Sequence, residues 1–123
     1  MKTDFDHWLA AQFAESGPFT LLILLVRIEA RDAVPLKSSY AHLIGNDTNW
    51  AEMRRLLDSA RTPWDGVAFF VGLGLAGGPL PDGAAARRLK DVEADVASDR
   101  LALNRGRFFD REGRQLRIDE AAA

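Results

Sequence analysis

A glycine-rich segment that follows an apolar run is the closest approach in this chain to a known binding motif. Residues 72–77 spell Gly-Leu-Gly-Leu-Ala-Gly, the glycine spacing of a dinucleotide-binding loop, in which the backbone approaches a pyrophosphate at a helix N-terminus. Here Gly78, Pro79, Pro81 and Gly83 follow the motif and delay any helix. The pattern therefore predicts no nucleotide cofactor. It favours a strand whose glycines allow close packing, followed by a loop at 77–83 that could form the rim of a pocket.

A second group has the side chains of a nucleophilic hydrolase. Ser38, Ser39 and His42 lie close in sequence to Asp47, and serine, histidine and aspartate together can activate a hydroxyl for attack. No serine of the chain lies in a Gly-x-Ser-x-Gly turn between a strand and a helix. We therefore predict no catalytic residue, and the sequence favours a non-catalytic protein.

Metal-ligating residues are equally sparse. Asp4, Asp6 and His7 offer oxygen and imidazole ligands, but no second cluster follows at ligand spacing, and acidic residues in the first turn of a helix are explained by its dipole. The chain has no cysteine, which excludes disulfides and thiolate metal sites. We predict no metal and no cofactor.

Aromatic residues suggest a binding groove. Tyr40, Trp50 and Trp64 could together hold a flat ligand or the anchor residue of a partner. Trp50 falls on the apolar stripe of an expected helix, however, so core packing is the simpler interpretation. With their neighbours and the glycine-rich loop, the candidate binding residues are Tyr40, His42, Trp50, Trp64, Asp65, Gly77, Gly78 and Asp82.

Charge is unevenly distributed over the last third of the chain. Acidic residues recur every four positions from 91 to 99, and six arginines follow between 100 and 117. Such polarity suits a two-fold contact in which the acidic patch of one copy meets the basic patch of another. The interaction patch we predict comprises Asp91, Asp95, Asp99, Arg105, Arg107, Arg111 and Arg114.

The same arginines raise the question of nucleic acid. Arg107 precedes Phe108 and Phe109, a basic and aromatic combination that can stack on single strands. The formal net charge is −2, so the chain lacks an overall basic footprint. We do not expect a nucleic-acid partner.

Length and composition indicate one ordinary domain. The chain has 123 residues, 47% of them hydrophobic and 28% charged, which suits a single domain over 1–123 with a frayed tail at 119–123. Arginine outnumbers lysine thirteen to three, which we attribute to the codon usage of a bacterial genome. The first residues lack the positive region of a signal peptide, so we expect none, and the most apolar run, 19–26, is too short to span a bilayer. We expect a cytoplasmic protein with no membrane partner.

Hydrophobic periodicity predicts three helices separated by strands. Helices are expected at 4–15, where Thr3 or Asp4 is the cap, at 50–61, where Asn49 and Glu52 resemble a capping box, and at 84–98. Strands are expected at 19–30, where a helix remains an alternative, at 67–76, and in a meander at 101–103, 107–109 and 115–118. Residues 32–46 are expected to be irregular, with a short helical turn at 40–44.

These elements predict a single compact α+β or α/β domain, with three helices on a three- to five-stranded mixed sheet and a C-terminal antiparallel hairpin or meander. Their alternation favours some parallel pairing. In that case a pocket would lie at the carboxyl ends of the strands, near Arg31, Asp32 and the loop from Gly77 to Asp82.

Three hypotheses of function follow. The first is a small interaction or assembly module that forms a homodimer or binds another protein. The second is a small-molecule-binding protein or small enzyme with its pocket at Gly77–Asp82. The third is a nucleic-acid-binding accessory protein that uses the arginine-rich meander.

Overall fold

The computed structural model describes residues 2–30, 32–45 and 47–118 of the chain. Its helices are α1 (Asp4–Ser16), α2 (Trp50–Asp58), α3 (Asp82–Ser98) and the 3₁₀ helix η1 (Arg100–Arg105). Its strands are β1 (Phe19–Glu29), β2 (Asp32–Leu43), β3 (Gly66–Gly72), β4 (Arg107–Asp110) and β5 (Gln115–Leu116). The expected tail at 119–123 and Arg31 lie outside the described residues.

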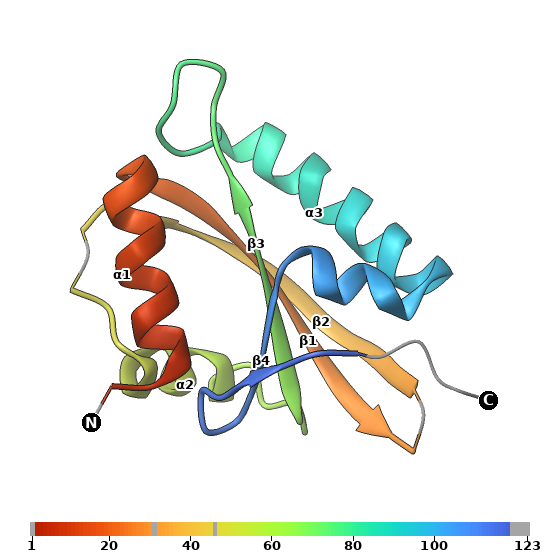
Figure 1. Cartoon of the computed structure of the whole chain (residues 1–123). Helices are drawn as coiled ribbons and strands as arrows, with labels where there is room; N and C mark the ends of the chain where they lie inside the picture. Colours follow the sequence, from red (N-terminus) through yellow and green to blue (C-terminus); the bar gives the residue numbers. More distant parts are fainter. Residues whose placement is uncertain (1, 31, 46, 119–123) are drawn as a thin grey trace.

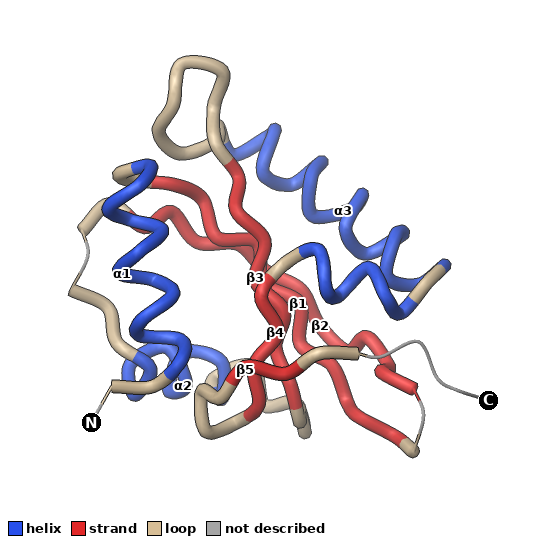
Figure 2. The backbone as a smooth tube through the Cα atoms, viewed as in Figure 1, coloured by secondary structure: helices blue, strands red, loops and turns tan. Residues whose placement is uncertain are grey.

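The strands form one sheet in the order β2-β1-β3-β4-β5, and every neighbouring pair of strands is antiparallel (Figure 2). The prediction of a single domain with a sheet of three to five strands and a C-terminal hairpin is confirmed, and of the two classes left open the fold is α+β. The expectation of parallel pairing is wrong, because β1 turns back directly into β2 instead of crossing over through a helix. Because β1 and β3 are antiparallel, their carboxyl ends lie at opposite ends of the sheet, so Asp32 and the loop from Gly77 to Asp82 do not line one pocket.

Helices cover both faces of the sheet (Figure 1). Helices α1 and α2 pack on one face, whose core contains Phe5, Phe69 and Phe109. On the other face, next to α3 and η1, the core contains Leu103 and Phe108. Strand β1 is buried on both sides, which explains its continuous apolar run and confirms the predicted strand rather than the alternative helix.

Three segments differ from the prediction, and the first is 73–76, which was expected to continue a strand but lies in the loop after β3. Residues 32–43 form the edge strand β2 instead of an irregular segment with a helical turn, because an edge strand half exposed to solvent does not need the apolar pattern on which the prediction depended. Residues 101–103 belong to η1 instead of a strand. The Asp99 carboxylate accepts a hydrogen bond from the Leu101 N–H at 3.0 Å and starts that helix.

The N-termini of α1 and α2 share one carboxylate. Asp6 accepts hydrogen bonds from the backbone N–H and hydroxyl of Thr3, at 2.8 and 3.0 Å, through one oxygen. Its other oxygen accepts from the Trp50 N–H at 2.8 Å, at the start of α2. Burial alone would raise the pKa of Asp6, but these hydrogen bonds and the charge of Lys2 together lower the pKa below its ordinary value.

The first helix is also tied to the last hairpin. The Phe5 N–H donates to the carbonyl of Gly113 at 3.1 Å, and the Gln115 N–H donates to the Asp4 carboxylate at 2.9 Å. Gly113 has a φ of +76°, and a Cβ there would lie 2.9 Å from the Trp50 ring. The turn between β4 and β5 therefore needs glycine to close against both helices.

Candidate functional site

The two candidate tryptophans are structural. Trp50 is 6% exposed and Trp64 is 1% exposed, and both belong to the core beneath α1 and α2. Arg111 stabilises this arrangement: its guanidinium lies 4.4 Å from the centre of the Trp64 ring and donates to the Asp58 carboxylate at 3.1 Å. Tyr40 is half-buried on β2. Core packing, the simpler interpretation, holds for both tryptophans.

Asp65 has a local role. Its carboxylate accepts a hydrogen bond from the Ile28 N–H at 2.8 Å, and its own N–H donates to the Val26 carbonyl at 2.8 Å. Asp65 thus joins the C-terminal end of β1 to the start of β3. The candidate loop at Gly77 and Gly78 lies beyond the other end of β3.

His42 and Asp82, by contrast, come together at the start of α3. The imidazole Nε2 of His42 lies 2.7 Å from the Asp82 carboxylate, and its Nδ1 lies 2.8 Å from the Thr20 hydroxyl. The Thr20 hydroxyl also accepts a hydrogen bond from the Leu80 N–H at 2.8 Å. When the imidazole is neutral, the Thr20 proton therefore goes to Nδ1 and the imidazole proton is on Nε2. We call these four residues the latch, because they join β1 and β2 to the loop before α3.

The latch has the connectivity of a catalytic triad, but not its accessibility. Thr20 is fully buried, and its hydroxyl already makes two hydrogen bonds. Leu80 packs so closely over this region that a Cβ on Gly72 would lie 2.5 Å from the Leu80 Cδ1 atom. A substrate cannot reach the Thr20 oxygen, so the latch positions the loop instead of performing nucleophilic catalysis.

Sequence reasoning selected His42 and Asp82 but missed Thr20 and Leu80. Thr20 is the only polar residue in the apolar run from 19 to 26. A buried hydroxyl requires a hydrogen-bond partner, so this was the available signal. Its partner Leu80 lies 60 positions away, and no spacing rule connects the two.

The loop between β3 and α3 projects from the end of the molecule (Figure 1). The Gly74 N–H donates to the Gly78 carbonyl at 2.9 Å, and the Gly77 N–H donates to the Gly74 carbonyl at 3.0 Å. Gly77 and Gly78 have φ values of +86° and +76°, which other residues adopt only with strain. Hydrogen bonds within the loop thus hold it in a defined shape, with the side chain of Leu75 fully exposed.

A groove of about 870 Å³ lies between this loop and α3. Loop residues Leu73, Leu75 and Pro79 line its apolar wall, and helical residues Arg87, Arg88 and Lys90 line the other side. In the described ranges no carboxylate lies within 4.0 Å of these three cations. Of the loop at 77–83 that was expected to form a rim, Pro79, Leu80 and Pro81 line the groove, whereas the candidate residues Gly77, Gly78 and Asp82 are not among its lining residues.

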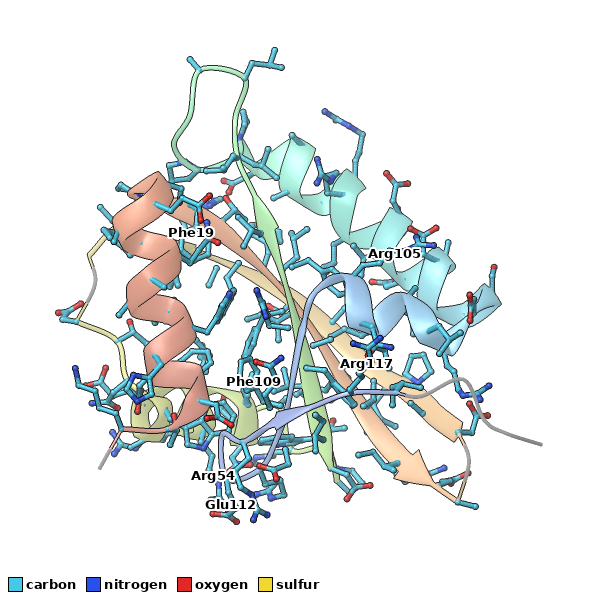
Figure 3. The ribbon with its side chains drawn as sticks, viewed as in Figure 1. Phe19, Arg54, Arg105, Phe109, Glu112 and Arg117 are labelled. Carbon is cyan, nitrogen blue, oxygen red and sulfur yellow. The ribbon has the colours of Figure 1, made fainter. Side chains whose placement is uncertain are left out.

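The predicted charge patch is divided between separate parts of the surface. Arg105 lies 3.9 Å from Asp95 beside α3, and Arg114 lies 2.9 Å from Asp110 in the last hairpin. Figure 3 places Arg105 far from Arg54 and Glu112, which pair at 3.5 Å at the opposite end of the molecule. The remaining members have separate surroundings: Asp91 lines the groove, Asp99 caps η1, Arg107 is exposed on β4 and Arg111 packs on Trp64.

Strand β2 forms one edge of the sheet. Tyr40 and His42 lie on it with ring centres 5.5 Å apart. Beside it, a hollow of about 280 Å³ is lined by Ser39, Ala41 and the exposed Leu56 of α2.

Within the ranges that the structure describes, no three His, Asp or Glu side chains lie close enough to hold a metal ion. No helix there is long and apolar enough to cross a membrane. Comparisons of the chain with protein-family models, with curated proteins and with solved structures find no match to any of them.

Proposed function

We propose that this protein is an assembly module in which two copies join their sheets through β2. The observation that carries the proposal is the outer edge of β2, which has no neighbouring strand among the described residues. In an antiparallel sheet, alternate residues of an edge strand direct their N–H and C=O groups away from the sheet. Such an edge is a template for pairing with another strand.

The two halves of β2 differ in how they oppose this pairing. The first half contains Pro35, which has no N–H, the charged Lys37, and a register shift opposite Leu25 and Val26. Proline, charge and bulges are the features that protect edge strands. The second half, from Ser38 to Leu43, has no proline, no lysine or arginine, and no register shift. We therefore assign the contact to 38–43.

A second copy of the chain is the partner that this edge fits best. An antiparallel contact between identical strands closes on itself about a two-fold axis. Opposed residues in such a pair point to the same face of the sheet. One residue must therefore lie opposite its own copy, with the two-fold axis between them. For a contact over 38–43 that residue is Tyr40 or Ala41. The exposed Leu56 and its hollow would receive apolar side chains of the second copy.

The test is the mass in solution, measured by light scattering after size exclusion over a concentration series. We expect about twice 13.6 kDa for the wild type, unchanged at high salt, because backbone hydrogen bonds and apolar contacts are not screened as exposed ion pairs are. Ser39→Lys places a positive charge on each copy at the contact, so this variant should have the mass of a monomer. Ser98→Lys, an equal change of charge at the exposed end of α3, should retain the double mass.

Three results would contradict the proposal. The first is the mass of a monomer for the wild type at every concentration. The second is the mass of a dimer for Ser39→Lys. The third is loss of the dimer at high salt, which would favour the charged-patch contact of 91–117 instead.

A further inference from the structure

We propose that the groove between residues 73–81 and α3 binds an amphipathic anion, a single molecule with an alkyl chain and a carboxylate or phosphate head. This inference goes beyond self-association and does not depend on it. Its starting point is Leu75, a large apolar side chain that is fully exposed. Hydrogen bonds within the loop and two glycines with positive φ fix the conformation of the turn around it. This turn keeps the Leu75 side chain exposed to solvent.

The apolar wall of the groove continues from Leu75. Leu73 is also exposed, and Pro79 and Leu80 line the same hollow. No aromatic side chain lines it, so a nucleotide base would find no ring on which to stack. Aliphatic side chains and prolines of this kind suit an alkyl chain.

The opposite wall supplies the charge. Arg87, Arg88 and Lys90 lie within one turn of α3, and in the described part of the chain none has a carboxylate within 4.0 Å. Asp91 is the one acidic residue that lines the groove. Guanidinium groups bind carboxylate and phosphate oxygens in pairs, so an anionic head would lie against Arg87 and Arg88.

The shape favours one molecule over a membrane surface. A volume of about 870 Å³ falls within the range of small-molecule sites, roughly 300–1,000 Å³. The same helix also carries Asp82, Glu93 and Asp95, which an anionic bilayer would repel. A concave groove with a local cluster of cations is better matched to a single head group.

The latch positions the loop for this role. The Leu80 N–H is bound to the buried Thr20 hydroxyl, and Asp82 is bound to His42. Both contacts anchor the end of the loop that enters α3. The apolar wall is thus fixed relative to the cations before a ligand arrives, which reduces the entropy lost on binding.

The experiment uses dodecanoate and dodecyl phosphate, each below its micelle concentration, with dodecanol as the uncharged probe. Calorimetry should show saturable one-to-one binding of both anions, and the amide signals of Gly74, Gly77 and Gly78 should shift in NMR spectra. The double variant Arg87→Gln/Arg88→Gln should weaken binding about tenfold or more. Leu75→Ser should weaken it by a similar factor, and it should remain folded because Leu75 has no packing to lose.

Arg55→Gln is the matched control, because Arg55 is an exposed arginine on α2 outside the groove. It should bind as tightly as the wild type. Equal weakening by Arg55→Gln, equal affinity for dodecanol, or no saturation would each overturn the proposal, as would binding to phosphatidylglycerol vesicles without binding of the monomeric probes. Repeating the titration with Ser39→Lys separates the outcome from that of self-association.

Discussion

Asp6 is the residue whose replacement tests the packing of α1 and α2 most directly. Its carboxylate accepts from Thr3 through one oxygen and from the first N–H of α2, at Trp50, through the other. Asn is nearly isosteric with Asp, but it has one carbonyl oxygen that accepts and one NH₂ group that only donates. Whichever way the amide of Asp6→Asn is turned, its NH₂ group faces a backbone N–H, either that of Thr3 at the start of α1 or that of Trp50 at the start of α2.

The expected cost follows from these contacts. A helix N-cap interaction contributes about 1 kcal/mol, and a hydrogen bond to a charged group contributes roughly 1.5–3 kcal/mol. Asp6→Asn weakens one of the two helix termini and removes the charge that favours both. We expect a loss of about 2 kcal/mol in the free energy of unfolding, which lowers the urea midpoint by about 1 M.

The pH dependence gives a second check. The pKa of Asp6 in the folded protein lies below its ordinary value of 3.8. The stabilisation by the ionised carboxylate is therefore complete above pH 3.8 and is lost as the pH falls through the folded pKa. The difference between wild type and Asp6→Asn should be constant between about pH 5 and 7 and should narrow below about pH 4.

Urea unfolding followed by tryptophan fluorescence measures both effects. Glu15→Gln, which removes the same charge from an exposed position near the end of α1, is the control and should change the midpoint little. If the free energy of unfolding of Asp6→Asn lies within about 0.5 kcal/mol of the wild type at pH 7, the range typical of surface substitutions, Asp6 does not join the two helices as described. A difference that widens at low pH would refute the sign of its pKa shift.

The remaining predictions concern the latch and two glycines. Thr20→Val should destabilise by about 1–3 kcal/mol in urea unfolding, because the buried Leu80 N–H loses its acceptor, whereas Thr20→Ser, which keeps the hydroxyl, should cost less. Gly106→Ala should lower the melting temperature, since its Cβ would lie 2.4 Å from the Phe69 carbonyl oxygen. Gly83→Ala should increase the free energy of unfolding by about 0.5 kcal/mol and so raise the melting temperature slightly, because alanine favours the helix and its Cβ in α3 meets nothing closer than 3.6 Å. A rise in melting temperature with Gly106→Ala would contradict the packing of η1 against β3, and a fall with Gly83→Ala would contradict the open surroundings of Gly83.

The parts of the fold that could be predicted carry strong local signals. The run from 19 to 26 is apolar because β1 is covered on both faces, and Asn49 caps α2 as its spacing with Glu52 indicated. The β2 strand could not be predicted in this way. Its Ser38 and Ser39 are typical of loops, and they are extended because β1 provides the hydrogen-bonding partner.

The candidate site shows the same division. His42 and Asp82 could be selected by residue type, but their contact depends on a hairpin that brings β2 beside the start of α3. Nothing local in the sequence distinguishes Arg87, Arg88 and Lys90 from a solvated helix face. Their interest arises from the shape of the loop opposite them, which two glycines determine.

The tie between the first helix and the last hairpin has a consequence for how the chain is made. Phe5 leaves the ribosome well before its backbone partner Gly113, which follows it by more than a hundred positions in the sequence. At about 5–20 residues per second, translation separates the two by on the order of 10 s. During that interval the apolar β1 segment and α1 lack the hairpin that closes over them. Nascent chains stalled before residue 113 should therefore be cleaved readily within α1 and should recruit chaperones, and release of the full-length chain should end both.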